Sequence, residues 1–299
     1  MADRSFMKMV EAKWPDTLLC VGLDTDPGKI SKKIEALIRK EGNLPSYGSV
    51  GPLMLGFNKR IIEATKDLVC TYKLNLGFYL AQGIQGLYAL QETVEFIGEV
   101  VPDAPVIIDG KFGDIGSSAA QYARFAFEII GADAVTVNPY LGQEDAIDVF
   151  LKYENKGIFV LCRTSNEGAK EFQNFDILGS VGDQERYKLQ ISCLYGEVSK
   201  HVSELWNGLG NCGLVTGATY PGELKEIRRV VGDMPILIPG VGTQGGDLEQ
   251  AVKNGVNSRG DGIIINSSSG ILYKSTGSDF AEAAREEAKR LRDEINEHR

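Results

Sequence analysis

The chain reads VIIDGKFGDIG at residues 106–116, and this stretch decides how the rest of the sequence is interpreted. It begins as an apolar, β-branched run typical of a buried strand, and then brings three charged residues among three glycines. Asp109 and Lys111 are two residues apart, so they point to the same side while the chain stays extended. The segment is therefore either a built site or a strand-end ion pair, followed by a helix that Asp114 or Ser117 caps.

Around this stretch, apolar strand-like runs alternate with helical patterns along the chain. Eight such units in 299 residues indicate a (β/α)8 TIM barrel, an α/β fold in which one parallel sheet closes on itself. The competing fold, an open doubly wound sheet, usually has fewer strands and a GxGxxG motif after its first strand, which this sequence lacks. We expect strands at residues 18–23, 70–74, 106–108, 134–137, 158–162, 213–216, 236–238 and 262–265, and helices at residues 57–68, 85–100, 119–130, 143–151, 184–206, 222–231, 247–253 and 279–297.

Two segments depart from this alternation, but neither predicts a second domain, so we expect one barrel domain over residues 1–299. Residues 26–53 are polar, with a lysine-rich patch followed by Gly, Pro and Ser, and they are interpreted as an inserted helix and loop. Residues 166–186 form the longest connection that follows a strand. Loops at that end of a barrel often cover the functional site.

Composition argues against several classes of protein. The net charge of −9 argues against a nucleic-acid partner, and an anionic ligand would need local cations or backbone amides. The sequence has no apolar run long enough to cross a membrane and no signal-peptide pattern, so no membrane partner is expected. The five cysteines lack CxxC spacing, which indicates reduced thiols in a cytoplasmic protein. Only two histidines are present, so we expect neither histidine catalysis nor a metal site.

Charged residues recur where neighbouring strands end. Asp24 follows the first strand, Lys73 and Asn75 end the second, and Asp109 and Lys111 end the third. Barrel enzymes carry their chemistry at these carboxyl ends, and buried charges there are costly unless they are paired or used. Alternating lysines and aspartates also favour each other's charged forms. We therefore prefer an active site at one mouth of the barrel over a rim network of salt bridges.

Five motifs in the same order resemble the orotidine 5′-monophosphate decarboxylase family. They are GLD at 22–24, YKLN at 72–75, DGKFGDIG at 109–116, TSNEGA at 164–169 and PGVGTQGG at 239–246. The NPYLG turn at 138–142 and the extra length at 26–53 resemble the longer-chain branch of that family. The resemblance implies cofactor-free decarboxylation of orotidine 5′-monophosphate to uridine 5′-monophosphate, the last step of de novo pyrimidine nucleotide synthesis, by a cytoplasmic homodimer.

The resemblance also implies the catalytic residues. Loss of carbon dioxide leaves an electron pair on a ring carbon, and with no cofactor to absorb it fixed charge must stabilise it. Lys111 is expected to stabilise this anion and then protonate it. Lys73 is expected to orient Asp109 and to bind the ribose side, and Asp109 is expected to raise the energy of the bound substrate by repelling its leaving carboxylate. Asp114 is expected to complete the alternating line of lysine and aspartate charges. By similarity, Asp114 and Ser118 act across the dimer interface.

Further substrate-binding residues follow from the same resemblance. Asp24 is expected to accept hydrogen bonds from the ribose hydroxyls, and Ser165 to hold the polar edge of the pyrimidine. From the residues alone, both are ordinary turn residues. The glycine-rich segment 240–246 offers backbone amides at the start of a helix as a phosphate cradle. The complete set of expected substrate contacts is Asp24, Asn75, Ser118, Ser165, Pro239, Gly242, Gln244 and Ser269.

Ser269 stands where the family usually has an arginine for the phosphate. A neutral hydroxyl cannot replace a bidentate guanidinium. Three interpretations remain: Arg259 substitutes for it, although it precedes the strand and belongs at the wrong end of the barrel; the change was engineered; or the protein binds substrate weakly. Remote phosphate binding assists catalysis, so Ser269→Arg is expected to raise catalytic efficiency.

Other functions stay open from the sequence. Sugar-phosphate decarboxylases and aldolases of related barrels resemble the same DxKxxD pattern but use it around a magnesium ion, so a chelator separates them from a metal-free enzyme. Schiff-base chemistry at Lys73 or Lys111 is a second alternative, testable by borohydride trapping with a carbonyl substrate. A catalytically idle nucleotide-binding barrel is the third, and the complete set of lysines and aspartates argues against it.

Overall fold

Eight parallel strands close into a barrel in the computed structural model, which describes residues 4–42, 50–181, 188–241 and 245–299. The strand order around the barrel is β1-β10-β9-β8-β5-β4-β3-β2, so the last strand returns to the first and no edge remains. The predicted (β/α)8 barrel is confirmed. Its strands are β1 (Leu19–Gly22), β2 (Thr71–Asn75), β3 (Val106–Phe112), β4 (Ala134–Val137), β5 (Gly157–Arg163), β8 (Cys212–Thr216), β9 (Ile236–Pro239) and β10 (Ile263–Ser267).

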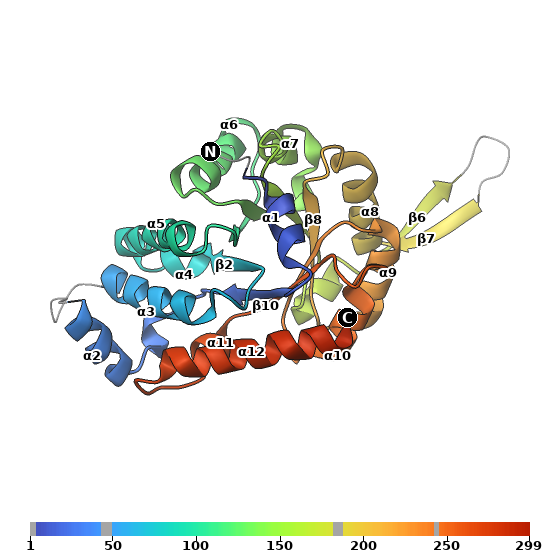
Figure 1. The fold of residues 1–299 in the computed structure, drawn as a ribbon. Helices are drawn as coiled ribbons and strands as arrows, with labels where there is room; N and C mark the ends of the chain where they lie inside the picture. The colour runs from blue at the N-terminus through green and yellow to red at the C-terminus, as the bar shows by residue number, and fades with distance from the viewer. Residues whose placement is uncertain (1–3, 43–49, 182–187, 242–244) are drawn as a thin grey trace.

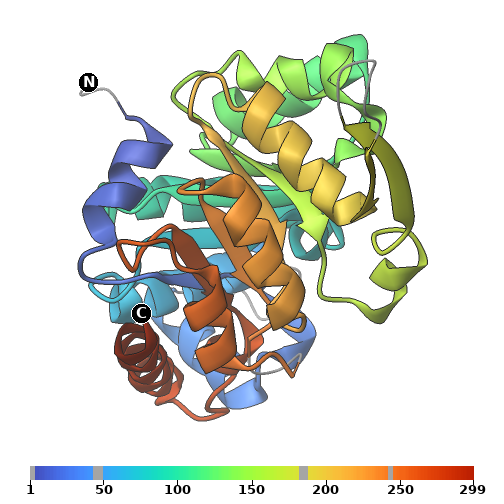
Figure 2. The same ribbon diagram turned by 90° about the vertical axis from the view of Figure 1, so that its right-hand side faces the viewer.

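Helices cover the outside of this barrel (Figures 1 and 2). The C-terminal helix α12 (Phe280–His298) lies along the bottom of Figure 1, next to α3 (Val50–Thr65), the helix that precedes β2. The α-helices are α1 (Phe6–Lys13), α2 (Lys32–Glu41), α3 (Val50–Thr65), α4 (Leu76–Leu80), α5 (Gly83–Val100), α6 (Gly116–Arg124), α7 (Asp148–Leu151), α8 (Leu194–His201), α9 (Pro221–Val231), α10 (Leu248–Gly255), α11 (Ser269–Leu272) and α12 (Phe280–His298). Shorter 3-10 and π turns are η1 (Pro27–Lys29), η2 (Phe125–Ile129), η3 (Pro139–Leu141), η4 (Gln143–Ile147), η5 (Glu167–Glu171) and η6 (Val202–Trp206).

The register of the strands brings the chemistry-bearing residues to one mouth. Lys73 on β2 lies opposite Gly22 on β1, and Asn75 lies opposite Asp109 on β3. On the other side of β1, Val21 lies opposite Ser267 at the end of β10. The carboxyl ends of β10, β1, β2 and β3 are therefore neighbours, as the fold prediction requires.

The segment after β5 differs from its prediction. A helix was expected over residues 184–206, but β6 (Asp176–Val181) and β7 (Lys188–Cys193) pair as an antiparallel hairpin that projects from the barrel (Figure 1). The helix begins only at Leu194, where α8 starts. Residues 188–193 alternate polar and apolar side chains, which is the period of a strand and not of a helix. Of the long connection at 166–186, residues 182–186 lie outside the described part.

The insertion at 26–53 contains the expected additional helix, α2. The next helix, α3, starts at Val50, earlier than the expected start at residue 57. Gly51 and Pro52 were interpreted as part of a loop, but proline is tolerated in the first turn of a helix. In the described ranges no helix is long and apolar enough to cross a membrane. All five cysteines are free thiols.

Candidate active site

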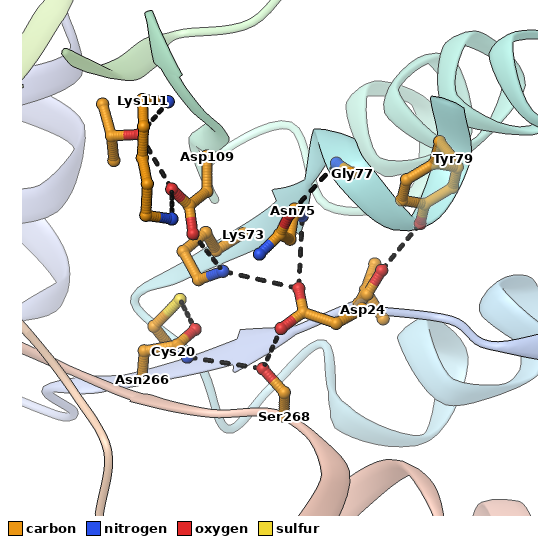
Figure 3. A network of polar contacts seen from close by, with 12 residues as sticks. Cys20, Asp24, Lys73, Asn75, Gly77, Tyr79, Asp109, Lys111, Asn266 and Ser268 are labelled. Carbon is orange, nitrogen blue, oxygen red and sulfur yellow. Dashed lines mark hydrogen bonds and ion pairs between the residues drawn. The ribbon is translucent and has the colours of Figure 1, made fainter. Parts of the chain in front are cut away.

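Lys73 is the centre of the charged mouth. Its ammonium lies 3.4 Å from Asp24 Oδ1 and 3.2 Å from Asp109 Oδ2, and its side chain is only 3% exposed (Figure 3). Burial by itself lowers the pKa of this lysine, but attraction by the two carboxylates outweighs burial and the pKa lies above its ordinary value. Lys73 is therefore a permanent cation that fixes both aspartates.

Asp109 joins this buried lysine to a second, more exposed one. Its Oδ1 accepts hydrogen bonds from Lys111 Nζ at 2.7 Å and from Thr136 Oγ1 at 2.8 Å. Burial on its own raises the pKa of Asp109, but the charges of Lys73 and Lys111 and these hydrogen bonds hold it well below its ordinary value. The carboxylate is thus ionised even though most of it is removed from water.

Lys111 owes its position to an irregularity in β3. The pairing with β4 shifts between Ile108 and Phe112, and Lys111 adopts the left-handed region with φ of 46°. Its backbone N–H donates to Thr136 Oγ1 at 2.9 Å. The same-side placement that holds while the chain stays extended therefore does not apply at Lys111. The bulge still turns the ammonium of Lys111 back to Asp109, and its side chain remains about half exposed to the pocket.

Asp24 is held from three sides. Beside Lys73, its Oδ1 accepts from the backbone N–H of Asn75 at 3.2 Å, and its Oδ2 accepts from Ser268 Oγ at 2.8 Å (Figure 3). Ser268 fits there because the neighbouring residue on β1 is Gly22, where a Cβ atom would lie 1.9 Å from the serine hydroxyl. This contact explains why a glycine precedes the Leu-Asp pair at the end of β1.

These side chains line a cleft of about 560 Å³, a size suited to a small ligand. Two expected residues, Asp114 and Ser118, lie outside its lining; Asp114 Oδ1 accepts from the backbone of Ile115 at 2.8 Å. No side chain caps α6, so the helix-cap interpretation of Asp114 and Ser117 is wrong. Gly242 and Gln244 lie outside the described residues. The expected residues that line the cleft are Asp24, Lys73, Asn75, Asp109, Lys111, Ser165, Pro239 and Ser269.

Comparison with known proteins identifies the family. The sequence profile of the orotidine 5′-phosphate decarboxylase / HUMPS family matches residues 17–286. Orotidine 5′-phosphate decarboxylase of Azoarcus sp. (strain BH72) is 43% identical over 296 residues, covering 98% of this chain and 99% of that protein. The chain belongs to the orotidine 5′-phosphate decarboxylase / HUMPS family. The protein of the same name from Cellvibrio japonicus is 42% identical and covers 98% of each chain. The structure of Leishmania donovani OMP decarboxylase matches with a TM-score of 0.76 and 32% identity, covering 98% of each chain.

Within this family fold, Arg259 lies where the sequence predicted, away from the mouth. It pairs with Asp233 at 2.8 Å and with Asp261 at 3.3 Å, next to Trp14 and the C-terminal Arg299. The loop that carries Arg259 precedes β10, so it belongs to the amino-terminal end of the barrel. Arg259 therefore does not replace an arginine at position 269.

Sequence reasoning missed three residues of the decarboxylase-family site. Thr136 bridges Asp109 and Lys111, Ser268 binds Asp24, and Lys29 also lines the cleft. Thr136 and Ser268 are neutral, and nothing in the sequence distinguishes Thr136 from other strand residues. Ser268 could be found from its place directly after a strand, because that is where barrel sites lie.

Proposed function

We propose that this protein decarboxylates orotidine 5′-monophosphate to uridine 5′-monophosphate without a cofactor, and that Lys111 protonates the ring carbon. The observation that carries the proposal is the alternating line Asp24–Lys73–Asp109–Lys111, joined by contacts of 2.7 to 3.4 Å at the mouth of a family barrel. Full-length relatives at 41–43% identity with the name orotidine 5′-phosphate decarboxylase support it.

The reaction follows from the placement of these charges. With the substrate carboxylate beside Asp109, the bond between the ring carbon and the carboxyl carbon breaks, carbon dioxide leaves, and the electron pair stays on the ring carbon. The Lys111 ammonium stabilises that pair by fixed charge and then transfers a proton to the carbon. The neutral amine regains its proton from solvent, to which Lys111 is about half exposed.

The remaining residues of the cleft bind the nucleotide in this proposal. Asp24 accepts hydrogen bonds from the ribose hydroxyls, next to Asn75. Ser165 and Pro239 contact the pyrimidine side, and the segment after β9, which includes Gly242 and Gln244, takes the phosphate together with position 269. Lys73 contacts both Asp24 and Asp109, so it connects the residue that binds the ribose to the carboxylate at the reacting end of the cleft.

The proposal includes a homodimer in the cytoplasm, with one barrel domain over residues 1–299. Asp114 and Ser118 would then act in the partner's site, since neither lines the cleft of its own chain. Exposed apolar side chains follow the ends of the neighbouring strands β3 and β4: Ile115 is 58% exposed, Tyr140 89% and Leu141 45%. Large exposed apolar groups of this kind are typical of surfaces that become buried in an assembly.

The test is the ultraviolet absorbance of orotidine 5′-monophosphate mixed with the protein, with and without a chelator. We expect the absorbance change of decarboxylation at the same rate in both samples. A rate abolished by the chelator would instead indicate the magnesium chemistry of related sugar-phosphate barrels. Lys111→Ala is expected to lower turnover by at least about a hundredfold, the lower end of the usual contribution of general acid catalysis. Undiminished turnover would remove Lys111 as the proton donor.

A further inference from the structure

The turn that follows β1 is hydrogen-bonded to Tyr273, which ends α11, the short helix after β10. The backbone N–H of Asp26 donates to Tyr273 Oη at 2.7 Å, and Asp26 Oδ1 caps η1 by accepting from Gly28 N–H at 2.9 Å. Burial raises the pKa of the Tyr273 phenol to about 12, so the ring stays neutral. Residues 26–29 are thus held beside the segment that contains Ser269, at the β10–β1 side of the cleft.

Lys29 ends this turn and lines the same cleft as Ser269 and Tyr273. Its ammonium lies 5.6 Å from the centre of the Tyr273 ring, within the range of a cation–π contact. The phenol ring and the capped turn therefore hold an exposed lysine at the wall of the cleft.

The lysines of the cleft differ in whether a carboxylate of the protein pairs with them. Among the described lining residues the cations are Lys29, Lys73 and Lys111. Lys73 contacts two carboxylates and Lys111 contacts one, whereas Lys29 has no carboxylate within 4 Å in the described ranges. Lys29 is accordingly the lining cation whose charge is available to an anion from outside the protein.

A nucleotide monophosphate needs such a cation. Asp24 and Asp109 repel a phosphate, and Lys73 and Lys111 belong to the ring and ribose end of the charge line. We propose that the ammonium of Lys29 binds the phosphate of the nucleotide, in place of a guanidinium at position 269. This inference rests on the proposed function and names one of its binding groups. A lysine serves here as a point charge, with Ser269 beside it as a neutral hydroxyl.

The experiment compares two ligands that differ only in the phosphate. Uridine 5′-monophosphate and uridine are each tested as inhibitors of decarboxylation by the wild type, Lys29→Gln, Lys29→Arg and the control Lys33→Gln. Lys33 is an exposed lysine of α2 that does not line the cleft. For Lys29→Gln we expect the inhibition constant of the monophosphate to rise roughly tenfold or more, as for loss of a charge-assisted hydrogen bond, and that of uridine to stay unchanged. Lys29→Arg and Lys33→Gln should stay close to the wild type.

Two results would overturn the inference. One is a Lys29→Gln protein that binds the monophosphate as tightly as the wild type. The other is an equal loss for the monophosphate and for uridine, which would show a general change in the shape of the cleft. Failure of the proposed function looks different, because the wild type would then not convert orotidine 5′-monophosphate at all. Calorimetric titration of wild type and Lys29→Gln with uridine 5′-monophosphate still tests Lys29 in that case, and absence of binding to both proteins overturns the inference as well.

Discussion

Asp109 keeps its charge because two ammonium groups and a hydroxyl face it in a buried position. Its pKa in the folded chain lies below the value of about 4 that an unfolded aspartate has. A depressed pKa contributes stability above the unfolded value, and this contribution is lost as the pH falls through the folded value. The wild type should therefore lose stability in acid, in part through this one residue.

The substitution Asp109→Asn tests this linkage. At neutral pH we expect the variant to be less stable than the wild type, because Lys73 and Lys111 lose a shared counter-charge. The difference in the free energy of unfolding should narrow below about pH 4, where Asp109 of the unfolded wild type takes up a proton while the folded carboxylate is still ionised. Urea unfolding at a series of pH values measures it, with Asp103→Asn as an exposed-carboxylate control. A difference that stays constant down to pH 2 would contradict the assignment.

Ser269 provides a second prediction for a single residue. Ser269→Arg adds a guanidinium beside the cleft that Lys29 also lines, so catalytic efficiency at limiting substrate should rise. In a Lys29→Gln background the same arginine should recover most of the lost affinity for uridine 5′-monophosphate, since either cation then serves the phosphate. Steady-state kinetics of the single and double variants measure both effects. No gain in either background would indicate that the phosphate is held elsewhere.

The residues that sequence reasoning found are those whose charge is unusual for their place. Lys73 and Asp109 are conspicuous because they follow apolar strands, where a charge is costly. Thr136 has no such signal: its role depends on the bulge of β3, and a bulge results from the packing of two strands. Lys29 was interpreted only as part of the charged patch of the inserted segment, because only the folded turn places it in the cleft.

At the scale of the element, the bulge of β3 depends on one hydroxyl of β4. Thr136 accepts from the backbone of Lys111 and donates to Asp109, so Thr136→Val should release both at once. We expect kcat to fall about tenfold to a hundredfold through misplacement of Lys111, and stability to fall by about 1 kcal/mol. Thr136→Ser retains the hydroxyl and should restore most of the rate.

A matched control for Thr136→Val exists at the end of another strand. Thr216 on β8 is also buried, but its hydroxyl finds no hydrogen-bond partner among the described residues. Thr216→Val should therefore leave turnover unchanged and stability equal or slightly higher. Turnover that falls equally in both valine variants would show that the rate responds to packing at strand ends in general, and not to the bulge.

The elements themselves were predictable to different degrees. The eight barrel strands are buried on both faces, so they stand out as short apolar runs, and each was found. The β6–β7 hairpin was missed because it projects from the barrel and adds no apolar run of that kind. The alternation at residues 188–193 was present in the sequence, but it was taken as the start of the helix that follows it.

At the scale of the whole molecule, the question is which chain completes the charge line. Asp114 lies two residues beyond the end of β3, yet it does not line the cleft of its own chain. Ile115, next to Asp114, and Tyr140, in the turn that follows the neighbouring strand β4, are both exposed. A homodimer that buries these side chains would also bring Asp114 to a partner's cleft, so assembly and activity would be coupled.

Subunit mixing tests this coupling directly. Lys111→Ala and Asp114→Asn should each be nearly inactive as pure proteins. If Asp114 acts across the interface, a mixed dimer carries both lesions in one cleft and none in the other. After unfolding and refolding of an equal mixture, activity should therefore recover to about a quarter of the wild type, because random pairing makes about half of the dimers mixed and each has one intact site. If Asp114 acts within its own chain, every cleft keeps one lesion and the mixture stays as inactive as its components.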